Sequence, residues 1–418
     1  MIPAFILAWR ALVRGHVVTL LLAATALAHL LLPALVRGDG TADGWREMYV
    51  RAVTGATFLF TAATVLVCAC GFLAQERRRV RLTLVAVRPA SLFSVAAGTW
   101  LALCLAAGLA YCATAVFTWA RMPSAPDCMH HWAPALPPPA ETAKLMMAEY
   151  LADPKTPENV RKAPKSAVLS LLTNKELDRY DVVRPGAEMS WPFPEGLDAG
   201  EGVQVRVRFA TQFELRAPFE GTFELGGLGA SVSNTTQAVL DIPLAPRAVS
   251  GPAGCGLRFA NTGRETVMLR PRRDLEVLSP ADSFPANLAR AAGQMLASTA
   301  LLAAFGLFLS AALSRPVAIF TALVAVLVAM MAPSVVLQFP DGLDVALSDR
   351  IGLAISRAVT LLASAAGEAE PVSDLATGTC IEWRALGRGV LLNVGLLPAA
   401  LLALAAFIAR RRPLDAQS

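Results

Sequence analysis

The sequence has little charge for its length, and this shortage excludes an ordinary soluble protein. Only 17% of the 418 residues are Asp, Glu, Lys or Arg, whereas 55% are hydrophobic. A soluble globular domain carries about 25% charged residues. The basic residues gather in short loops, which fits membrane orientation better than nucleic-acid binding. The composition therefore predicts a multi-pass protein that is embedded in the lipid bilayer and binds no nucleic acid.

The sequence also lacks the motifs that mark common nucleotide-dependent and metal-dependent enzymes. It contains no G-x-x-x-x-G-K-S/T loop to hold phosphates, and no H-E-x-x-H or paired C-x-x-C metal signature. Cys128, Met129, His130 and His131 gather soft ligands, but adjacent residues rarely chelate one ion, and no second ligand cluster supports them. We therefore predict no metal, no cofactor and no enzymatic activity in this chain.

Six long apolar runs are predicted to cross the membrane. Each is long enough for a hydrocarbon core of about 30 Å. None carries Asp, Glu, Lys or Arg near its centre, which disfavours an ion-coupled transporter and catalysis within the membrane. These runs assign residues 17–121, 291–338 and 388–418 to the membrane part. The predicted spans are Val17–Val36, Ala52–Leu73, Leu92–Trp119, Ala291–Leu313, Val317–Leu337 and Val390–Ile408.

Two shorter segments leave alternatives open. Residues 1–16 are amphipathic and are interrupted by Arg10 and Arg14, so they are either a positive flank to the first span or an interfacial helix. We adopt the interfacial helix as the working hypothesis. Ile351–Ala366 contains Arg357 and lies in the acidic loop 339–387, where a re-entrant or interfacial helix is favoured over a seventh span.

The arginines predict the orientation of the spans. The segment Gln75–Ser91, between the second and third spans, holds Arg77, Arg78, Arg79, Arg81 and Arg88. Arg315 and the run 410–412 fall on the same side when the N-terminus is cytoplasmic. By the positive-inside rule, both termini and segment 75–91 are cytoplasmic. The expected location is the cell's cytoplasmic (inner) membrane.

Residues 122–290, between the third and fourth spans, are predicted to form a large extracytoplasmic α+β insert. Apolar residues at helical spacing predict a helical lead-in within 140–180, at Glu141–Leu151 and Ser166–Arg179. Alternation of Val203, Val205 and Val207 with polar residues then predicts a half-buried strand. Further strands are expected within a β-rich region, 200–275, that has the pattern of a β-sandwich. These strands are Gly221–Leu225, Ala238–Ile242, Gly256–Phe259 and Thr266–Leu269.

Three of the seven cysteines fall outside the predicted cytoplasmic and membrane parts. Cys128 and Cys255 lie in the insert and could form a disulfide. Sequence spacing alone cannot establish the geometry that a disulfide requires, so an unpaired state is an open alternative.

The segment Gln75–Ser91 resembles a motif in membrane subunits of the ABC-2 type of ABC transporter. In that family a short cytoplasmic segment after the second span starts with an acid–arginine pair, continues through Thr-Leu, and ends in Pro followed by a small residue. Glu76-Arg77, Thr83-Leu84 and Pro89-Ala90 match these features. Val80-Arg81 replaces the usual Gly-Thr, and Leu92 replaces the usual basic residue after the motif.

This resemblance implies a permease subunit that uses ATP hydrolysis by a separate ATPase subunit. It further implies a homodimer or a pair with a homologous permease. The residues that would dock on the ATPase are Glu76, Arg77, Arg78, Arg79, Arg81, Thr83, Leu84 and Pro89. Topology alone would also place arginines in this segment. The resemblance does not cover 122–290, and the alternative function is a membrane-anchored binding or sensing protein that acts through the β-rich region.

Overall fold

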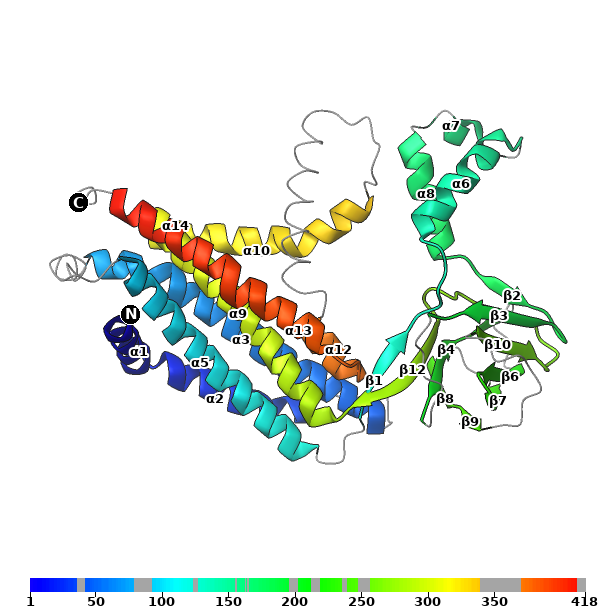
Figure 1. The fold of residues 1–418 in the computed structure, drawn as a ribbon, viewed down its shortest axis with the longest axis horizontal. Coiled ribbons are helices and arrows are strands. Elements are labelled where there is room, and N and C mark those ends of the chain that lie inside the picture. Colours follow the sequence, from blue (N-terminus) through cyan, green and yellow to red (C-terminus); the bar gives the residue numbers. More distant parts are fainter. Residues whose placement is uncertain are drawn as a thin grey trace. The chain divides into compact units, whose positions relative to one another are not determined.

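The computed structural model divides the chain into two compact units, each with its own hydrophobic core (Figure 1). The membrane unit comprises 1–126, 283–334 and 354–418, and the insert comprises 127–282 together with 335–353. The structure describes residues 1–35, 42–78, 92–122, 127–154, 156–161, 163, 165–194, 202–211, 219–234, 239–246, 256–338 and 370–411.

Five helices in the described part of the chain are long and apolar enough to cross a membrane. They coincide with the predicted spans one to four and six to within a residue or extend beyond them, which supports a membrane protein with several spans. The fifth predicted span falls on another helix, of which Arg315–Ala329 is apolar but short. Six spans therefore stay a prediction. The five helical stretches are Val17–Leu35, Gly44–Phe72, Leu92–Arg121, Phe284–Ala312 and Trp383–Arg410.

The helices of the membrane unit extend beyond the apolar runs that predict them. The helices that carry the second, fourth and last predicted spans begin at Ala42, Phe284 and Trp383, ahead of the predicted span starts Ala52, Ala291 and Val390. Hydrogen bonding continues where polar residues pack inside the bundle, so hydropathy underestimates helix length. The elements are α1 (Ile2–Arg14), α2 (Val17–Leu35), α3 (Ala42–Arg78), α5 (Leu92–Arg121), α9 (Phe284–Ala312), α10 (Arg315–Gln338), α12 (Pro371–Thr377), α13 (Trp383–Val390), the π-helical turn η1 (Leu391–Leu396) and α14 (Leu397–Arg411).

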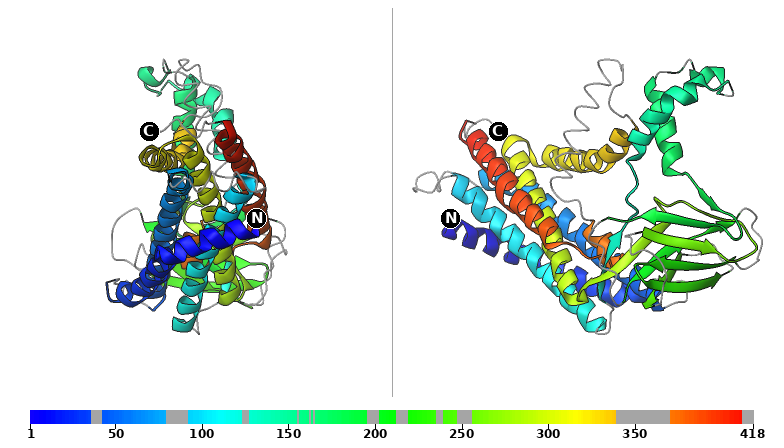
Figure 2. Two further views of the ribbon diagram at one scale, coloured as in Figure 1. Left: turned by 90° about the vertical axis from the view of Figure 1, so that its left-hand side faces the viewer. Right: turned by 45° about the vertical axis from the view of Figure 1, so that its right-hand side comes forward.

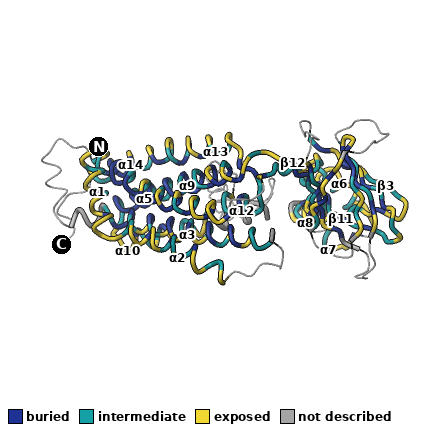
Figure 3. The backbone as a smooth tube through the Cα atoms, turned by 90° about the horizontal axis from the view of Figure 1, so that it is seen from below, coloured by how far each residue is buried: buried dark blue, intermediate teal, exposed yellow. Residues whose placement is uncertain are grey.

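Helix α9 is the central helix of the membrane unit. It packs against α3, α5 and α14, and much of its length is buried (Figure 3). Small residues permit this close packing. A Cβ atom at Gly306 would lie 2.7 Å from the Cβ atom of Ala69 on α3, so only glycine fits there. The bundle is thus built around the helix that directly follows the insert.

Within the residues that the structure describes, the insert combines three antiparallel sheets with three helices. The sheets have strand orders β1-β12-β4-β8, β3-β10-β6-β7-β9 and β2-β11-β5. The helices are α6 (Pro139–Ala152), α7 (Glu158–Arg161) and α8 (Lys165–Leu177). The strands are β1 (Cys128–Trp132), β2 (Asp181–Val183), β3 (Glu188–Pro192), β4 (Gln204–Arg208), β5 (Ala210–Thr211), β6 (Phe219–Leu225), β7 (Leu228–Asn234), β8 (Val239–Pro243), β9 (Ala245–Pro246), β10 (Gly256–Asn261), β11 (Val267–Leu269) and β12 (Leu275–Asp282).

One hydrophobic core joins these sheets. It includes Val207 of β4, Phe223 of β6 and Val267 of β11, which belong to three different sheets. The ring centroids of Phe209, Phe223 and Phe259 lie 4.8–6.0 Å apart at its centre. A shared core between opposed sheet faces is the packing principle of a β-sandwich. The predicted β-rich region is therefore confirmed.

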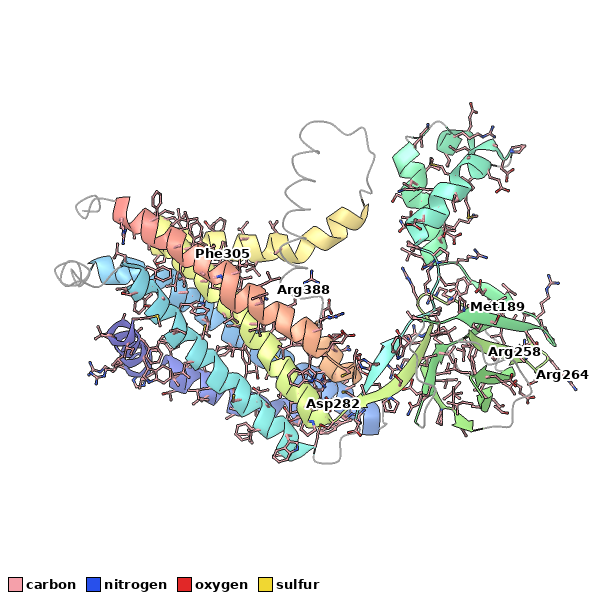
Figure 4. The ribbon with its side chains drawn as sticks, in the orientation of Figure 1. Met189, Arg258, Arg264, Asp282, Phe305 and Arg388 are labelled. Atoms are coloured by element: carbon pink, nitrogen blue, oxygen red, sulfur yellow. The ribbon has the colours of Figure 1, made fainter. Side chains whose placement is uncertain are left out.

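Strands extend beyond the predicted β-rich region at both of its ends. They run from Cys128 to Asp282 rather than from 200 to 275, because β1 and β12 pair with each other. The register runs from Cys128 opposite Asp282, which is labelled in Figure 4, to Trp132 opposite Val277. The compact unit comprises 127–282 in this part of the chain, and the extracytoplasmic range 122–290 stays a prediction.

Candidate functional site

The structure leaves the predicted ATPase-docking segment largely outside the described residues. Helix α3 continues through Arg78, so positions 75–78 are helical, but the side chains of Glu76, Arg77 and Arg78 are not described. Residues 79–91, and with them the remaining docking residues, lie outside the described part, as do Cys255 and Ile351–Ala366. The docking role, the disulfide and the re-entrant helix stay predictions. The undescribed docking residues are Arg79, Arg81, Thr83, Leu84 and Pro89.

The described chain instead presents a buried polar cluster on α9 that the sequence analysis missed. Asn287, Arg290 and Gln294 follow one another at spacings of three and four, so they share one face of the helix. Their exposed fractions are only 0%, 3% and 1%. A buried charge in a membrane helix bundle is costly and commonly marks a functional position. The only sequence signal was the spacing of these polar residues directly before an apolar run.

Asn287 holds the irregular backbone between α12 and α13. Its Nδ2 donates a hydrogen bond to the carbonyl oxygen of Thr379 at 2.8 Å, and its Oδ1 accepts one from the backbone N–H of Ile381 at 2.9 Å. Non-helical backbone inside a membrane protein must be satisfied by protein groups. Asn287 therefore fixes the joint between α12 and α13 on the central helix.

Arg290 contacts the same joint through its guanidinium group. Nη2 lies 3.4 Å from Cys380 Sγ, and the guanidinium carbon lies 5.1 Å from the centre of the Trp383 ring. A cation over an indole face is stabilised by the ring quadrupole. Trp383, the first residue of α13, is 64% exposed and lies over the buried guanidinium group.

The cluster continues to the start of the last span. A Cβ atom at Gly389 would lie 2.5 Å from Gln294 Oε1, so α13 and α9 touch there. Asn393 is fully buried in η1, where the helix widens into a π-turn. Such turns interrupt regular helical hydrogen bonding and are frequent at functional sites. We define the α9 polar cluster as Asn287, Arg290, Gln294 and Cys380.

The chemistry of the α9 polar cluster is that of a helix joint. Arg290 contributes a guanidinium group that donates hydrogen bonds, and the amides of Asn287 and Gln294 both donate and accept them. The cluster can thus hold α9, α12 and α13 together through fixed charge and hydrogen bonds, but its side chains do not make a general acid–base pair.

The run Cys128–His131 lies in β1, where alternate side chains point to opposite faces. Cys128 Sγ donates to the carbonyl oxygen of Asp282 at 3.2 Å, and His131 Nδ1 lies 2.9 Å from Glu276 Oε2. The hydrogen bond from His131 lowers the pKa of Glu276, against the opposing effect of burial. Among the residues that the structure describes, no group of three or more His, Cys, Asp or Glu could hold a metal ion.

Comparisons of the chain with protein-family models, with curated proteins and with solved structures gave no match.

Proposed function

We propose that the chain is the membrane-spanning permease subunit of an ABC-2 type ABC transporter, which moves a substrate across the cytoplasmic membrane with energy from a separate ATPase. The motif Glu76–Ser91 supports this assignment. So does the absence from the sequence of a phosphate-binding loop of its own. The observation that carries the proposal is that α1, with its two arginines, and Arg315 lie at the end of the bundle where this motif leaves α3.

Helix α1 lies at that end. It crosses α5 at Gly98, where a Cβ atom would lie 2.7 Å from the backbone nitrogen of Phe5, shortly after the motif gives way to α5 (Figure 2). Ala8 and Leu12 are buried, whereas Ile2 and Leu7 are 72% and 64% exposed. An exposed apolar face accompanied by Arg10 and Arg14 suits a helix that lies in the lipid headgroup region.

Arg315 belongs to the same end. Its Nε would lie 3.0 Å from a Cβ atom at Gly71, close to the point where α3 reaches Gln75. Arginines that flank one end of a bundle indicate its cytoplasmic side. Segment 75–91 would then face the cytoplasm between an interfacial helix and a basic turn, where a soluble ATPase can reach it.

In this proposal the bundle converts movement of segment 75–91 into movement of the spans. The segment connects α3 to α5, and both helices pack against α9. Helix α9 in turn packs against α14 and holds the α12–α13 joint through Asn287 and Arg290. ATP-driven displacement of the segment would therefore reach the last span through α9. A second membrane subunit, identical or homologous, would complete the transporter.

A second candidate is a membrane-anchored binding or sensing protein that acts through the insert. The independent hydrophobic core of the insert favours it, because a domain of this kind can bind a ligand without help from the membrane unit. The two functions are compatible if the insert serves the transporter.

Conservative substitutions in the motif test the docking role of these residues separately from their effect on membrane orientation. Glu76→Gln and the triple change Arg77→Lys, Arg78→Lys and Arg79→Lys keep the positive loop, so insertion should be unchanged, but they remove the carboxylate and the planar guanidinium forks. We expect loss of ATPase co-purification. Arg10→Lys is the matched control in α1 and should retain the ATPase. Wild-type protein that brings down no ATPase, or motif variants that retain it fully, would overturn the proposal.

A further inference from the structure

The helical hairpin of the insert contains a cavity of about 510 Å³ between α6 and α8. This volume lies in the range of small-molecule sites. Met146, Tyr150 and Leu172 provide an apolar wall, and Glu149, Asp153 and Glu176 provide carboxylates. Leu172 is buried in the small core that joins the two helices through Ala143 and Val168.

The wall beside the end of α6 is held in place by internal hydrogen bonds. Arg161 donates from Nη2 to the carbonyl oxygen of Pro154 at 3.0 Å and from Nε to that of Thr156 at 2.9 Å. The Thr156 hydroxyl donates to the carbonyl oxygen of Tyr150 at 2.6 Å. Pro154 and Tyr150 both line the cavity, so these bonds preform it. A preformed cavity binds a ligand with a smaller ordering cost.

Carboxylates outnumber ammonium groups among the described residues that line the cavity. Three carboxylates face a single lysine, Lys175, among the lining residues, and Arg179 lies 3.6 Å from Glu176 at one side. The Lys175 Nζ lies 5.4 Å from the centre of the Tyr150 ring. Aromatic faces next to carboxylates are the usual surroundings of bound ammonium groups. The protein's own ammonium therefore already occupies the position that a ligand cation would take.

We propose that this cavity binds an amphiphilic cation, that is, an ammonium or guanidinium group carried on an apolar chain or ring. The cationic group displaces Lys175 from the Tyr150 ring and is neutralised by Glu149. The apolar part packs on Met146 and Leu172. This assignment does not depend on the proposed transport function, because it concerns residues of the insert alone.

The probe for this site is hexyltrimethylammonium, with hexanoate as an apolar anion of similar chain length. Binding to the full-length protein in phosphatidylcholine nanodiscs is measured by ligand-observed NMR, with empty nanodiscs subtracted. We expect saturable binding of the cation and none of the anion. Tyr150→Leu should weaken binding, because it removes the aromatic face while keeping an apolar side chain.

Lys175→Met gives the decisive result. If Lys175 competes with the ligand for the Tyr150 ring, the substitution increases the affinity for the ligand; if Lys175 only supports the structure of the cavity, the substitution decreases it. Removal of the internal ammonium should tighten binding by about fivefold, the size expected when one cation–π contact no longer has to be displaced. Lys144→Met, on α6 but outside the lining of the cavity, is the matched control and should leave affinity unchanged. Equal binding of hexanoate, or unchanged or weaker binding in Lys175→Met, would overturn the proposal.

Discussion

At the scale of single residues, the amide side chain of Asn287 satisfies two backbone groups that have no partner within a regular helix or strand. Both of its polar atoms bond to backbone groups of the α12–α13 joint, far away in the sequence. Arg290 then adds a guanidinium contact to Cys380 between those two bonds. The joint is thus fixed to α9 by side chains rather than by regular secondary structure.

We predict that Asn287→Ala destabilises the membrane unit. The substitution leaves the buried Ile381 N–H unsatisfied, at a cost of about 1–3 kcal/mol, and also removes the hydrogen bond to the Thr379 carbonyl oxygen. Thermal unfolding of the purified protein in detergent should show a lower midpoint. Ser298→Ala is the control on the same helix, because that hydroxyl donates only within α9, to the Gln294 carbonyl. Equal midpoints for the two variants would show that Asn287 does not hold the joint.

At the scale of elements, sequence periodicity predicted those helices and strands whose signal lies within their own residues. Five apolar helices and the alternating strand around Val205 and Val207 were found in this way. Strand β1 was missed, because its pairing partner β12 lies at the other end of the insert. The start of α9 was missed for a similar reason. Asn287 and Arg290 resemble loop residues until α12 and α13 supply their partners.

The candidate site was therefore only partly accessible from the sequence. An incomplete match to a family motif was enough to indicate segment 75–91, because all residues of that motif lie within one short stretch of sequence. The α9 polar cluster combines residues that are nearly a hundred positions apart, such as Arg290 and Cys380 at a separation of 90. The cavity of the hairpin likewise depends on how α6 meets α8, which a helical period does not specify.

The contact between α9 and α3 gives a prediction about close packing. Gly306→Ala should destabilise the bundle by about 1–3 kcal/mol, because the new methyl group has to displace neighbouring atoms. Those neighbours are Ala69 Cβ at 2.7 Å and the Leu66 carbonyl oxygen at 3.2 Å. Gly108→Ala on α5 is the control, since its nearest neighbour would be Leu296 Cδ2 at 3.8 Å. Detergent unfolding of both variants measures the difference. A Gly306→Ala variant as stable as the control would contradict the packing.

At the scale of the whole molecule, the chain joins two units with separate cores. Among the described residues, the core of the insert draws on side chains from Trp132 to Val277, and the first and last strands of the insert pair with each other. Strand β12 is followed by Ser283 alone before α9 begins. The membrane unit therefore receives its central helix directly from the last strand of the insert.

We predict that residues 127–282 fold when they are expressed alone. Their circular dichroism should show β-structure and a single cooperative thermal transition, because the hydrophobic core is internal to this segment. A version that starts at Ala133 lacks β1 and exposes an edge of β12, so it should aggregate or unfold at a lower temperature. Non-cooperative unfolding of 127–282 would mean that the insert depends on the membrane unit.

The pairing of β1 with β12 also makes the insert an exchangeable cassette. Paired antiparallel residues have Cα atoms about 4.5–5.5 Å apart, so the chain leaves and rejoins the membrane unit through neighbouring points. A short turn, or any other domain whose ends lie side by side, could take this place without moving the ends of α5 and α9. Gene fusion or recombination at these two positions could then give the same set of spans a new recognition module.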